Sequence, residues 1–94
     1  MLIQNDITAN RGIFFIEVDN EKLAALYFSL SPGIMTINHT EVDEKLAGKS
    51  IGLQLVNHAV DYARTNNLKI IALCPFAKKV FDKRPDEYRD VLVE

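Results

Sequence analysis

The sequence predicts an α/β (α+β) fold: an antiparallel three-stranded meander, one amphipathic crossover helix, a further strand and a shorter helix. Three observations lead to this prediction. Aromatic and β-branched residues fill extended runs at 13–18, 22–30 and 34–42. Apolar residues recur at helical spacing over 51–66. A short apolar run at 68–73 follows that helix, as expected of a strand reached by a crossover connection.

The meander is predicted from the turn residues between its strands. Asp19-Asn20-Glu21 is polar, turn-forming sequence between the first two extended runs, which therefore form a hairpin. Ser31-Pro32-Gly33 is a second turn signal, after which the extended pattern resumes through Val42.

The crossover unit follows. The apolar face of the helix consists of Ile51, Leu55, Val56, Ala59, Val60 and Ala63. Asn66-Asn67 can supply a left-handed C-terminal cap, and the run at 68–73 suits a strand buried on both faces. Pro75 is well placed to open a second helix through about Lys83, which Pro85 ends. The remaining residues, 86–94, form a short, weakly specified tail.

Length and composition exclude several classes of protein. The 94 residues fit one domain spanning 1–94, and the net charge of -2 gives no general attraction to nucleic acid or an anionic membrane. No apolar run approaches the roughly 20 residues that span a bilayer, so the cytoplasm is the default location. A single cysteine, Cys74, forms no internal disulfide and no cysteine-based zinc cluster, and we expect no metal.

The segment at 46–52 lies between an extended run and the main helix. Glycine lets a backbone approach a ligand closely, and the unpaired N–H groups of a helix N-terminus suit phosphate oxygens. The segment is therefore a candidate pyrophosphate cradle. The alternative is that Gly48 is an ordinary loop glycine and Ser50 an N-cap. The spacing matches neither a Walker loop nor a dinucleotide-binding fingerprint.

Cys74 lies where the last strand ends and a helix begins, an environment that lowers a thiol pKa and favours reactivity. The alternative is a small buried hydrophobic residue. If the strands ending near His39 and Cys74 are neighbours, the two side chains approach each other as a nucleophile and its base, although no third orienting group is evident. His58 lies near the polar face of the helix and is expected at the surface.

A basic cluster lies on the second helix at Lys78, Lys79, Lys83 and Arg84. It is either a solvated face or a surface that attracts an adenosine phosphate.

Three segments in order resemble the small YjdJ-type subfamily of GCN5-related N-acetyltransferases: residues 38–42 (NHTEV), 46–56 (LAGKSIGLQLV) and 69–76 (KIIALCPF). The resemblance covers nearly the whole chain. It implies a minimal form of the fold in which two neighbouring parallel strands splay apart and acetyl-CoA enters the gap between them. The subfamily lacks the first helices and last strands of larger acetyltransferases, so much of the usual acceptor-binding wall is missing.

The resemblance also implies roles for particular residues. Thr40, Glu41 and Val42 would offer backbone hydrogen bonds to the pantetheine arm, and Cys74 would lie near the thioester. The pyrophosphate would lie against Ala47, Gly48, Lys49, Ser50, Ile51 and Gly52, with Lys45 opening the superfamily's phosphate-binding pattern. The chain departs from that pattern because Lys45 replaces arginine or glutamine and Ser50 replaces the second small residue. Val80 and Arg84 stand where relatives carry a tyrosine and a histidine.

Two functions from different classes remain open at this point. The first is acetyl transfer from acetyl-CoA to an unidentified amine, a small molecule or a protein, either by direct attack or through acetyl-Cys74 assisted by His39. The second is a non-catalytic module that binds or senses acetyl-CoA. The expected oligomeric state is a monomer or a weak dimer paired through the exposed edge of the first hairpin.

Overall fold

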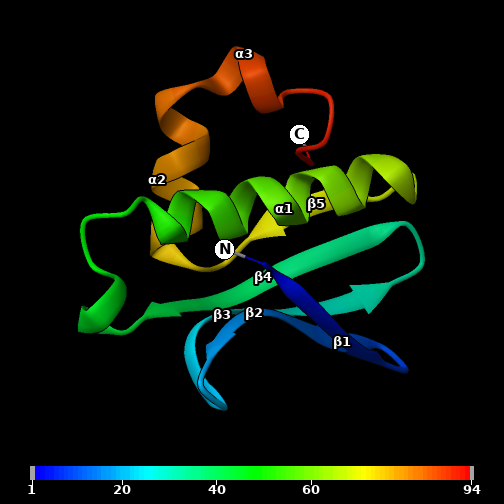
Figure 1. Cartoon of the computed structure of the whole chain (residues 1–94). Helices are drawn as coiled ribbons and strands as arrows, with labels where there is room; N and C mark the ends of the chain where they lie inside the picture. The colour runs from blue at the N-terminus through cyan, green and yellow to red at the C-terminus, as the bar shows by residue number, and fades with distance from the viewer. Residues whose placement is uncertain (1, 94) are drawn as a thin grey trace.

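The computed structural model describes residues 2–93 (Figure 1). The strands are β1 (Gln4–Thr8), β2 (Arg11–Val18), β3 (Glu21–Ser31), β4 (Ile34–Val42) and β5 (Lys69–Ala72), and the helices are α1 (Ile51–Thr65), α2 (Pro75–Lys83) and α3 (Pro85–Tyr88), with a 3₁₀ turn at Glu44–Leu46. The predicted meander, crossover helix, following strand and second helix are all present, so the predicted fold class is confirmed.

The strands form one five-stranded sheet in the order β1-β2-β3-β4-β5. Neighbouring strands are antiparallel except β4 and β5, which are parallel. The structure adds β1, which the sequence analysis did not predict because its residues are nearly all exposed and show no apolar alternation. Because β1 pairs along β2, the expectation of an exposed edge on the first hairpin is wrong, and β1 is the edge instead.

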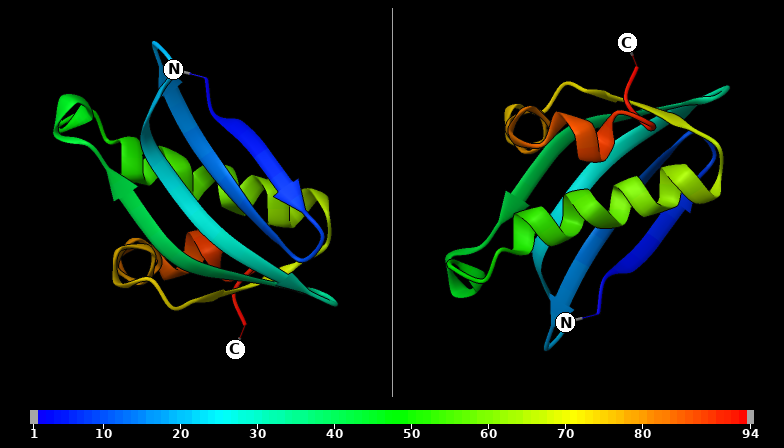
Figure 2. Two further views of the ribbon diagram at one scale, coloured as in Figure 1. Left: turned by 90° about the horizontal axis from the view of Figure 1, so that it is seen from below. Right: turned by 90° about the horizontal axis from the view of Figure 1, so that it is seen from above.

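The helices leave one face of the sheet bare. In the view from below, no helix lies in front of β1 to β4, whereas α1 crosses the sheet in the view from above (Figure 2). We call the face that α1 covers the helix face, and the opposite one the outer face. Phe14, Phe28 and Tyr62 pack together between the sheet and α1, which places Phe14 and Phe28 on the helix face.

The bare outer face corrects one prediction. The strand at 68–73 was expected to be buried on both faces, but only one side of β5 is covered. Ile70 is 1% exposed, whereas Ile71 is 37% and Leu73 is 66% exposed. An apolar run shows that a strand has two apolar sides, but it does not show that two layers cover them.

The C-terminal segment also differs from its prediction as a weakly specified tail. Tyr88 and Val91 are each 2% exposed, and Ile70 of β5 forms a parallel bridge with Leu92. The hydroxyl of Tyr88 donates to Asn57 Oδ1 at 2.8 Å. These contacts fasten the segment after α2 to α1 and to the outer edge of β5.

Turn and cap predictions agree with the backbone. Asp19 and Asn20 have φ of 51° and 64°, as a tight hairpin turn requires, and Asn67 after α1 has φ of 56°. Across residues 2–93, no helix combines the length and the apolar character needed to cross a membrane.

Candidate active site

The candidate site begins where β4 and β5 separate. Their parallel pairing runs only from Ile34 with Lys69 to Ile37 with Ala72. The carbonyl of Ile37 then accepts hydrogen bonds from the N–H groups of both Leu73 (2.9 Å) and Cys74 (3.1 Å). β4 continues to Val42 while the chain after Ala72 turns into α2. Within residues 2–93, the edge of β4 beyond Ile37 that faces away from β3 therefore pairs with no strand. We call this place the divergence point.

A β-bulge at the same place changes which side chains face the helices. In the pairing of β3 with β4, Phe28 lies opposite Ile37 and Tyr27 opposite His39, so Asn38 is an extra residue. A bulge shifts the alternation of side chains along a strand. Before it, Ile37 faces the helices. After it, Thr40 lies opposite the buried Leu26, and His39 lies opposite Tyr27.

Cys74 lies against Thr40 on the helix face of the divergence point. Its Sγ is 3.5 Å from Thr40 Oγ1, and the residue is only 3% exposed. Burial raises the pKa of this thiol. In the thiolate form, the Thr40 hydroxyl and the backbone N–H groups of Ala77, Phe76 and Thr40 donate to the sulfur, and these hydrogen bonds lower the pKa by more than burial raises it. The net effect is a lowered pKa, since Cys74 is the N-cap of α2 and meets the positive end of that helix.

The structure does not bring His39 to Cys74. His39 lies on the outer face, stacked on Tyr27 with 5.9 Å between ring centroids. Its Nε2 is 3.4 Å from Glu41 Oε2, and the Tyr27 hydroxyl donates to Glu41 Oε1 at 2.9 Å. That hydrogen bond and the nearby carboxylate raise the pKa of Tyr27. The orienting group that the sequence analysis did not find for His39 is thus Glu41. The sequence could have indicated this contact, because Glu41 is two residues from His39, and residues at that spacing lie on the same face of a strand.

The loop before α1 has the backbone that its glycine requires. Gly48 has φ of 79°, and nothing lies within 4 Å of the position its Cβ would occupy. Ser50 occupies the N-cap position but adopts a left-handed conformation (φ 56°), and its side chain makes no capping hydrogen bond. The first turn of α1 contains no acidic residue. Ser50 is therefore the N-cap residue by position, as the alternative expected, but its side chain satisfies none of the N–H groups at this helix end.

A hollow of about 420 Å³ opens beside this loop. Six of the predicted cofactor-binding residues line it or its rim: Val42, Ala47, Gly48, Ser50, Ile51 and Gly52. Leu46, Leu53 and Phe76 complete the lining, and we call it the cradle hollow. The ring of Phe76 packs on Gly52 so closely that an added Cβ would lie 2.7 Å from it. Glycine at this position therefore allows α2 to approach the start of α1.

Four predicted cofactor-binding residues lie outside that lining: Thr40, Glu41, Lys45 and Lys49. Thr40 contacts Cys74, and Glu41 contacts Tyr27 and His39. Lys45 Nζ is 2.9 Å from Glu21 Oε1 in an exposed ion pair, so its ammonium is held at the start of β3. The backbone carbonyl of Lys49 accepts a hydrogen bond from Gln54 Nε2 at 3.2 Å.

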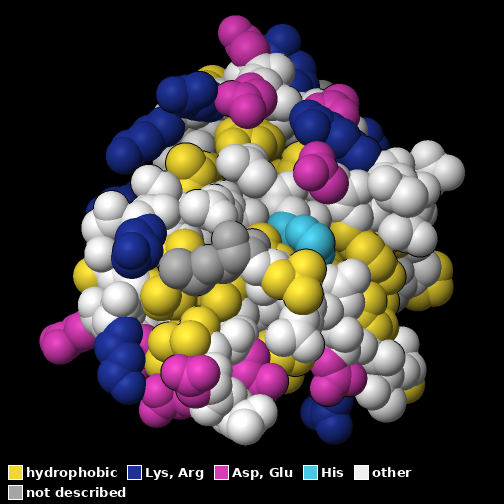
Figure 3. Space-filling view, viewed as in Figure 1, with side chains coloured by type: hydrophobic (Ala, Val, Ile, Leu, Met, Phe, Trp, Pro, Cys, Tyr) yellow, Lys and Arg dark blue, Asp and Glu magenta, His cyan; other side chains and the backbone are white. Residues whose placement is uncertain are grey.

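A second hollow, of about 370 Å³, adjoins the cradle hollow through Leu53 and Phe76. It lies between α1 and the two C-terminal helices, and Lys83 and Arg84 belong to its lining. Figure 3 shows basic side chains along the left of the region that α2 occupies in Figure 1, with acidic ones among them towards the top. Two of the four residues of the predicted basic cluster therefore line a hollow that shares Leu53 and Phe76 with the cradle hollow.

His58 is not the surface residue that the sequence predicted. It is half-buried, it packs edge-on against Phe14 with centroids 4.7 Å apart, and its Nε2 is 3.0 Å from Asn5 Oδ1. Desolvation lowers its pKa. The prediction of an exposed His58 failed because Asn5, its hydrogen-bond partner, lies on β1, and β1 was not predicted from the sequence.

With this geometry established, comparison with known proteins identifies the family. Residues 13–91 match the model of a family described as GCN5-related N-acetyl-transferase. The chain belongs to the GCN5-related N-acetyltransferase family. A protein from Staphylococcus aureus described as GCN5-like, whose structure was determined by NMR in solution, is 36% identical to it. That match covers 96% of this chain and 87% of the other, with a TM-score of 0.73.

Larger acetyltransferases share the fold at lower identity. A ribosomal-protein-alanine N-acetyltransferase from Brucella melitensis is 17% identical, with a TM-score of 0.67 over 82% of this chain and 62% of its own. An aminoglycoside acetyltransferase from an uncultured soil metagenomic sample, solved with sisomicin, is 18% identical, with a TM-score of 0.62 over 89% of this chain and 58% of its own. This family member thus matches less than two thirds of the length of these two structures. None of the curated proteins compared with it matches.

Proposed function

We propose that this family member transfers an acetyl group from acetyl-CoA to an amine. The observation that carries the proposal is the divergence point, where an unpaired strand edge, the thiol of Cys74 and the cradle hollow occur together. An extended ligand arm needs hydrogen-bonding groups along its length, and the free edge of β4 from Asn38 to Val42 offers them.

The pyrophosphate of acetyl-CoA would lie in the cradle hollow. Gly48 lets the loop backbone approach the phosphates, while the N–H groups at the start of α1 point outward with the positive end of the helix dipole. Lys49 and Ser50 belong to the same loop. Lys83 and Arg84 line the adjoining hollow and would attract the remaining phosphate on the adenosine.

We further propose that the acetyl group passes through Cys74. The hydrogen bonds that lower its pKa favour the thiolate, which is the nucleophilic form. The thiolate attacks the carbonyl carbon of the thioester, a bond from Sγ to that carbon forms, and CoA leaves as its thiolate. In the second step the amine nitrogen bonds to the same carbon, and the bond to Sγ breaks.

His39 would take a proton from the ammonium form of the acceptor on the outer face, before the neutral amine attacks. The second proton, which the nitrogen loses as it bonds to the acetyl carbon, goes to the departing Sγ. His39 lies on the outer face, across the sheet from the thiol, so it is placed to serve an amine arriving from that side. Nε2 faces Glu41, which leaves Nδ1 for the first proton. This proton then passes to solvent, because the His39 side chain is 62% exposed.

Acetyl-CoA titration followed by an acetylation assay tests the proposal. A ligand at 100 times its dissociation constant stabilises a protein by about 2.7 kcal/mol, which raises the melting temperature of a domain this size by roughly 10 °C or more. We expect this shift with acetyl-CoA and little shift with ATP. Absence of a shift at saturating acetyl-CoA would refute the proposal.

A non-catalytic acetyl-CoA-binding module is the second candidate. The observation that favours it is the bare outer face, where no element within residues 2–93 covers an acceptor. Binding of acetyl-CoA, with slow labelling of Cys74 and no turnover onto any amine, would support this candidate. Multiple turnovers on one defined amine would exclude it.

A further inference from the structure

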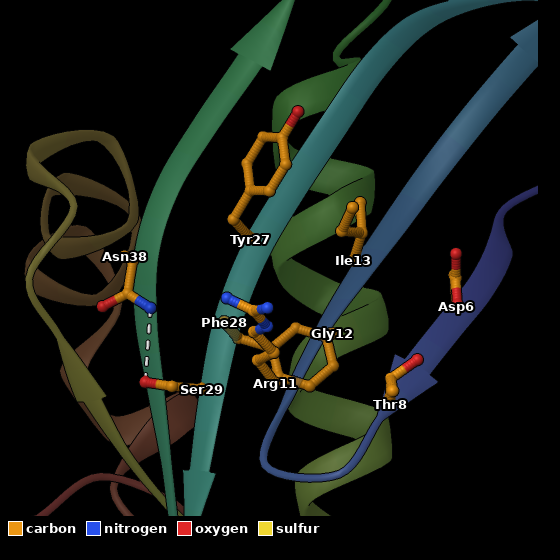
Figure 4. A pocket seen from close by; sticks show the side chains of 9 residues that line it. All are labelled: Asp6, Thr8, Arg11, Gly12, Ile13, Tyr27, Phe28, Ser29 and Asn38. Carbon is orange, nitrogen blue, oxygen red and sulfur yellow. Dashed lines mark hydrogen bonds between the residues drawn. The ribbon is translucent and has the colours of Figure 1, made fainter.

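The outer face carries a hollow of about 510 Å³. It lies across four strands, with Asp6 and Thr8 from β1, Arg11 and Ile13 from β2, Tyr27 and Ser29 from β3, and Asn38 from β4. Figure 4 shows these side chains in front of the sheet, with α1 behind it. We call it the sheet hollow. Gly12 and Phe28 form part of its floor.

One end of the sheet hollow reaches the proposed site of acetyl transfer. Asn38 lines it and is also the bulge residue next to Ile37, where β4 and β5 separate. Tyr27 lines it too and stacks on His39, the proposed proton acceptor. A molecule in this hollow therefore lies beside both the divergence point and His39.

The positive charge in the hollow, that of Arg11, lies near that end, and the negative charge of Asp6 lies away from it. Figure 4 shows the Arg11 side chain reaching over β3, while Asp6 lies on β1 at the opposite side. Among residues 2–93, no carboxylate lies within 4.0 Å of the Arg11 guanidinium. The five N–H donors of an arginine suit a carboxylate, which accepts two of them side by side.

Ser29 adds a second donor at the same end. Asn38 Nδ2 donates to Ser29 Oγ at 3.3 Å, so the hydroxyl hydrogen of Ser29 is free to point elsewhere. Figure 4 shows Ser29 and Asn38 joined by this bond beside the Arg11 side chain. A guanidinium and a hydroxyl donor therefore face one region of the hollow, and they complement an anion with two oxygens.

We propose that the sheet hollow binds the acceptor, and that the acceptor is a small amino carboxylate whose carboxylate lies on Arg11 and Ser29. This inference rests on the proposed acetyl transfer. The amine extends over β4 to the divergence point. Neighbouring strands are about 4.8 Å apart, so one to two spacings, roughly 5 to 10 Å, separate the Arg11 guanidinium from that point. A chain of several methylenes between amine and carboxylate spans this distance.

The experiment compares ω-amino acids with amines of equal length that lack the carboxylate. The pairs are β-alanine with propylamine, γ-aminobutyrate with butylamine, δ-aminovalerate with pentylamine, and ε-aminocaproate with hexylamine. We expect kcat/KM to be higher for the amino acid in the longer pairs, and the advantage to be smallest for β-alanine. Equal kcat/KM within every pair would overturn the inference.

Arg11→Gln tests the residue itself. A hydrogen-bonded charged pair contributes about 1.5 to 3 kcal/mol, so kcat/KM for δ-aminovalerate should fall roughly ten- to a hundredfold, mainly through KM, while pentylamine is unaffected. Lys22→Gln is the matched control, since Lys22 is an exposed cation over the Phe15 ring, outside the hollow. An equal loss in both variants, or no selective loss in Arg11→Gln, would overturn the assignment.

A binding measurement separates failure of this inference from failure of the proposed function. Amide chemical shifts are followed while δ-aminovalerate is added without acetyl-CoA. Shifts at Arg11, Ser29 and Asn38 that disappear in Arg11→Gln support the hollow as a binding site even if no transfer occurs. Efficient acetylation of alkylamines with no such shifts would instead leave the transferase standing and refute the carboxylate site.

Discussion

The hydroxyl of Thr40 lies 3.5 Å from the sulfur of Cys74, while the preceding residue in the chain faces the other side of the sheet. The bulge at Asn38 produces this relationship, because it places Thr40 rather than His39 towards the helices. The thiol of Cys74 and the imidazole of His39 therefore lie on opposite faces of the sheet at the divergence point.

Thr40→Val should raise the pKa of Cys74. Valine keeps the shape of threonine but removes the hydroxyl, whose hydrogen bond to the sulfur lowers the thiol pKa. The Cβ chemical shift of Cys74, the sole cysteine, reports its titration. We expect the midpoint to move to higher pH in Thr40→Val and to stay in place in Thr36→Val, a change on the same strand. An unchanged midpoint in Thr40→Val would show that the Thr40 hydroxyl does not contribute to lowering the pKa.

Cys74→Ala should abolish transfer without abolishing binding. If the acetyl group passes through Sγ, turnover falls by more than about a hundredfold, while acetyl-CoA still raises the melting temperature. Cys74→Ser keeps the size of the side chain and should fail similarly, since a hydroxyl is a weaker nucleophile. Mass spectrometry of the wild type mixed with acetyl-CoA should detect one acetyl group on Cys74. Unchanged turnover in Cys74→Ala would establish direct attack by the amine.

Gly48→Ala should weaken acetyl-CoA binding beyond its effect on stability. Gly48 (φ 79°) and Gly33 (φ 74°) both have left-handed backbones, and neither has an atom within 4 Å of its absent Cβ. Alanine at either position should therefore cost a similar 1 to 2 kcal/mol, about the strain of that conformation. Only Gly48 lines the cradle hollow, so only Gly48→Ala should lose affinity in a calorimetric titration. Equal affinities in the two variants would remove Gly48 from the phosphate site.

Asp90→Asn should make the free energy of unfolding depend less on pH. Arg64 Nε and Nη2 donate to the two carboxylate oxygens of Asp90, each at 2.9 Å, and these hydrogen bonds hold the pKa of Asp90 below its ordinary value. A carboxyl with a lowered folded-state pKa stabilises the fold above its unfolded pKa of about 3.9, and this stabilisation is lost as the pH falls through the folded value. Urea unfolding should separate wild type from Asp90→Asn at neutral pH.

The two unfolding curves should converge in acid below the ordinary range of an aspartate pKa. Asp86→Asn is a suitable control, because the carboxylate of Asp86 meets only Arg89 one turn further on and joins no distant segments. A constant difference between wild type and Asp90→Asn at all pH values would mean that the ion pair is not responsible.

The elements with strong local patterns were predictable from the sequence. The hairpin turn at Asp19 and Asn20, the apolar face of α1 and the cap at Asn67 are each specified by nearby residues. β1 was not predicted, because it is held by pairing with β2 rather than by an apolar face of its own. The burial of Tyr88 and Val91 likewise depends on contacts with distant elements.

The sequence predicted which segments form the candidate site, but it did not predict on which face of the sheet their side chains lie. His39 and Cys74 were expected to approach each other because the strands that carry them end as neighbours. Strict alternation along β4 would also place His39 on the same side as Ile37, towards Cys74. The single extra residue Asn38 reverses that side, and nothing in the sequence marks it as a bulge. The sheet hollow was also missed, because it combines residues from four strands.

The order of the sheet has a consequence for how the protein folds. Each antiparallel strand pairs with its neighbour in the chain, so β1 to β4 can form through short loop closures. The parallel pairing of β4 with β5 closes a loop that contains all of α1, and it is the most sequence-distant strand pairing in the sheet. Contacts of this kind are the slow ones in folding. A chain still emerging from the ribosome, with Lys69 to Cys74 not yet released, can build the meander but not the divergence point. The proposed binding of acetyl-CoA would therefore report that the crossover has formed.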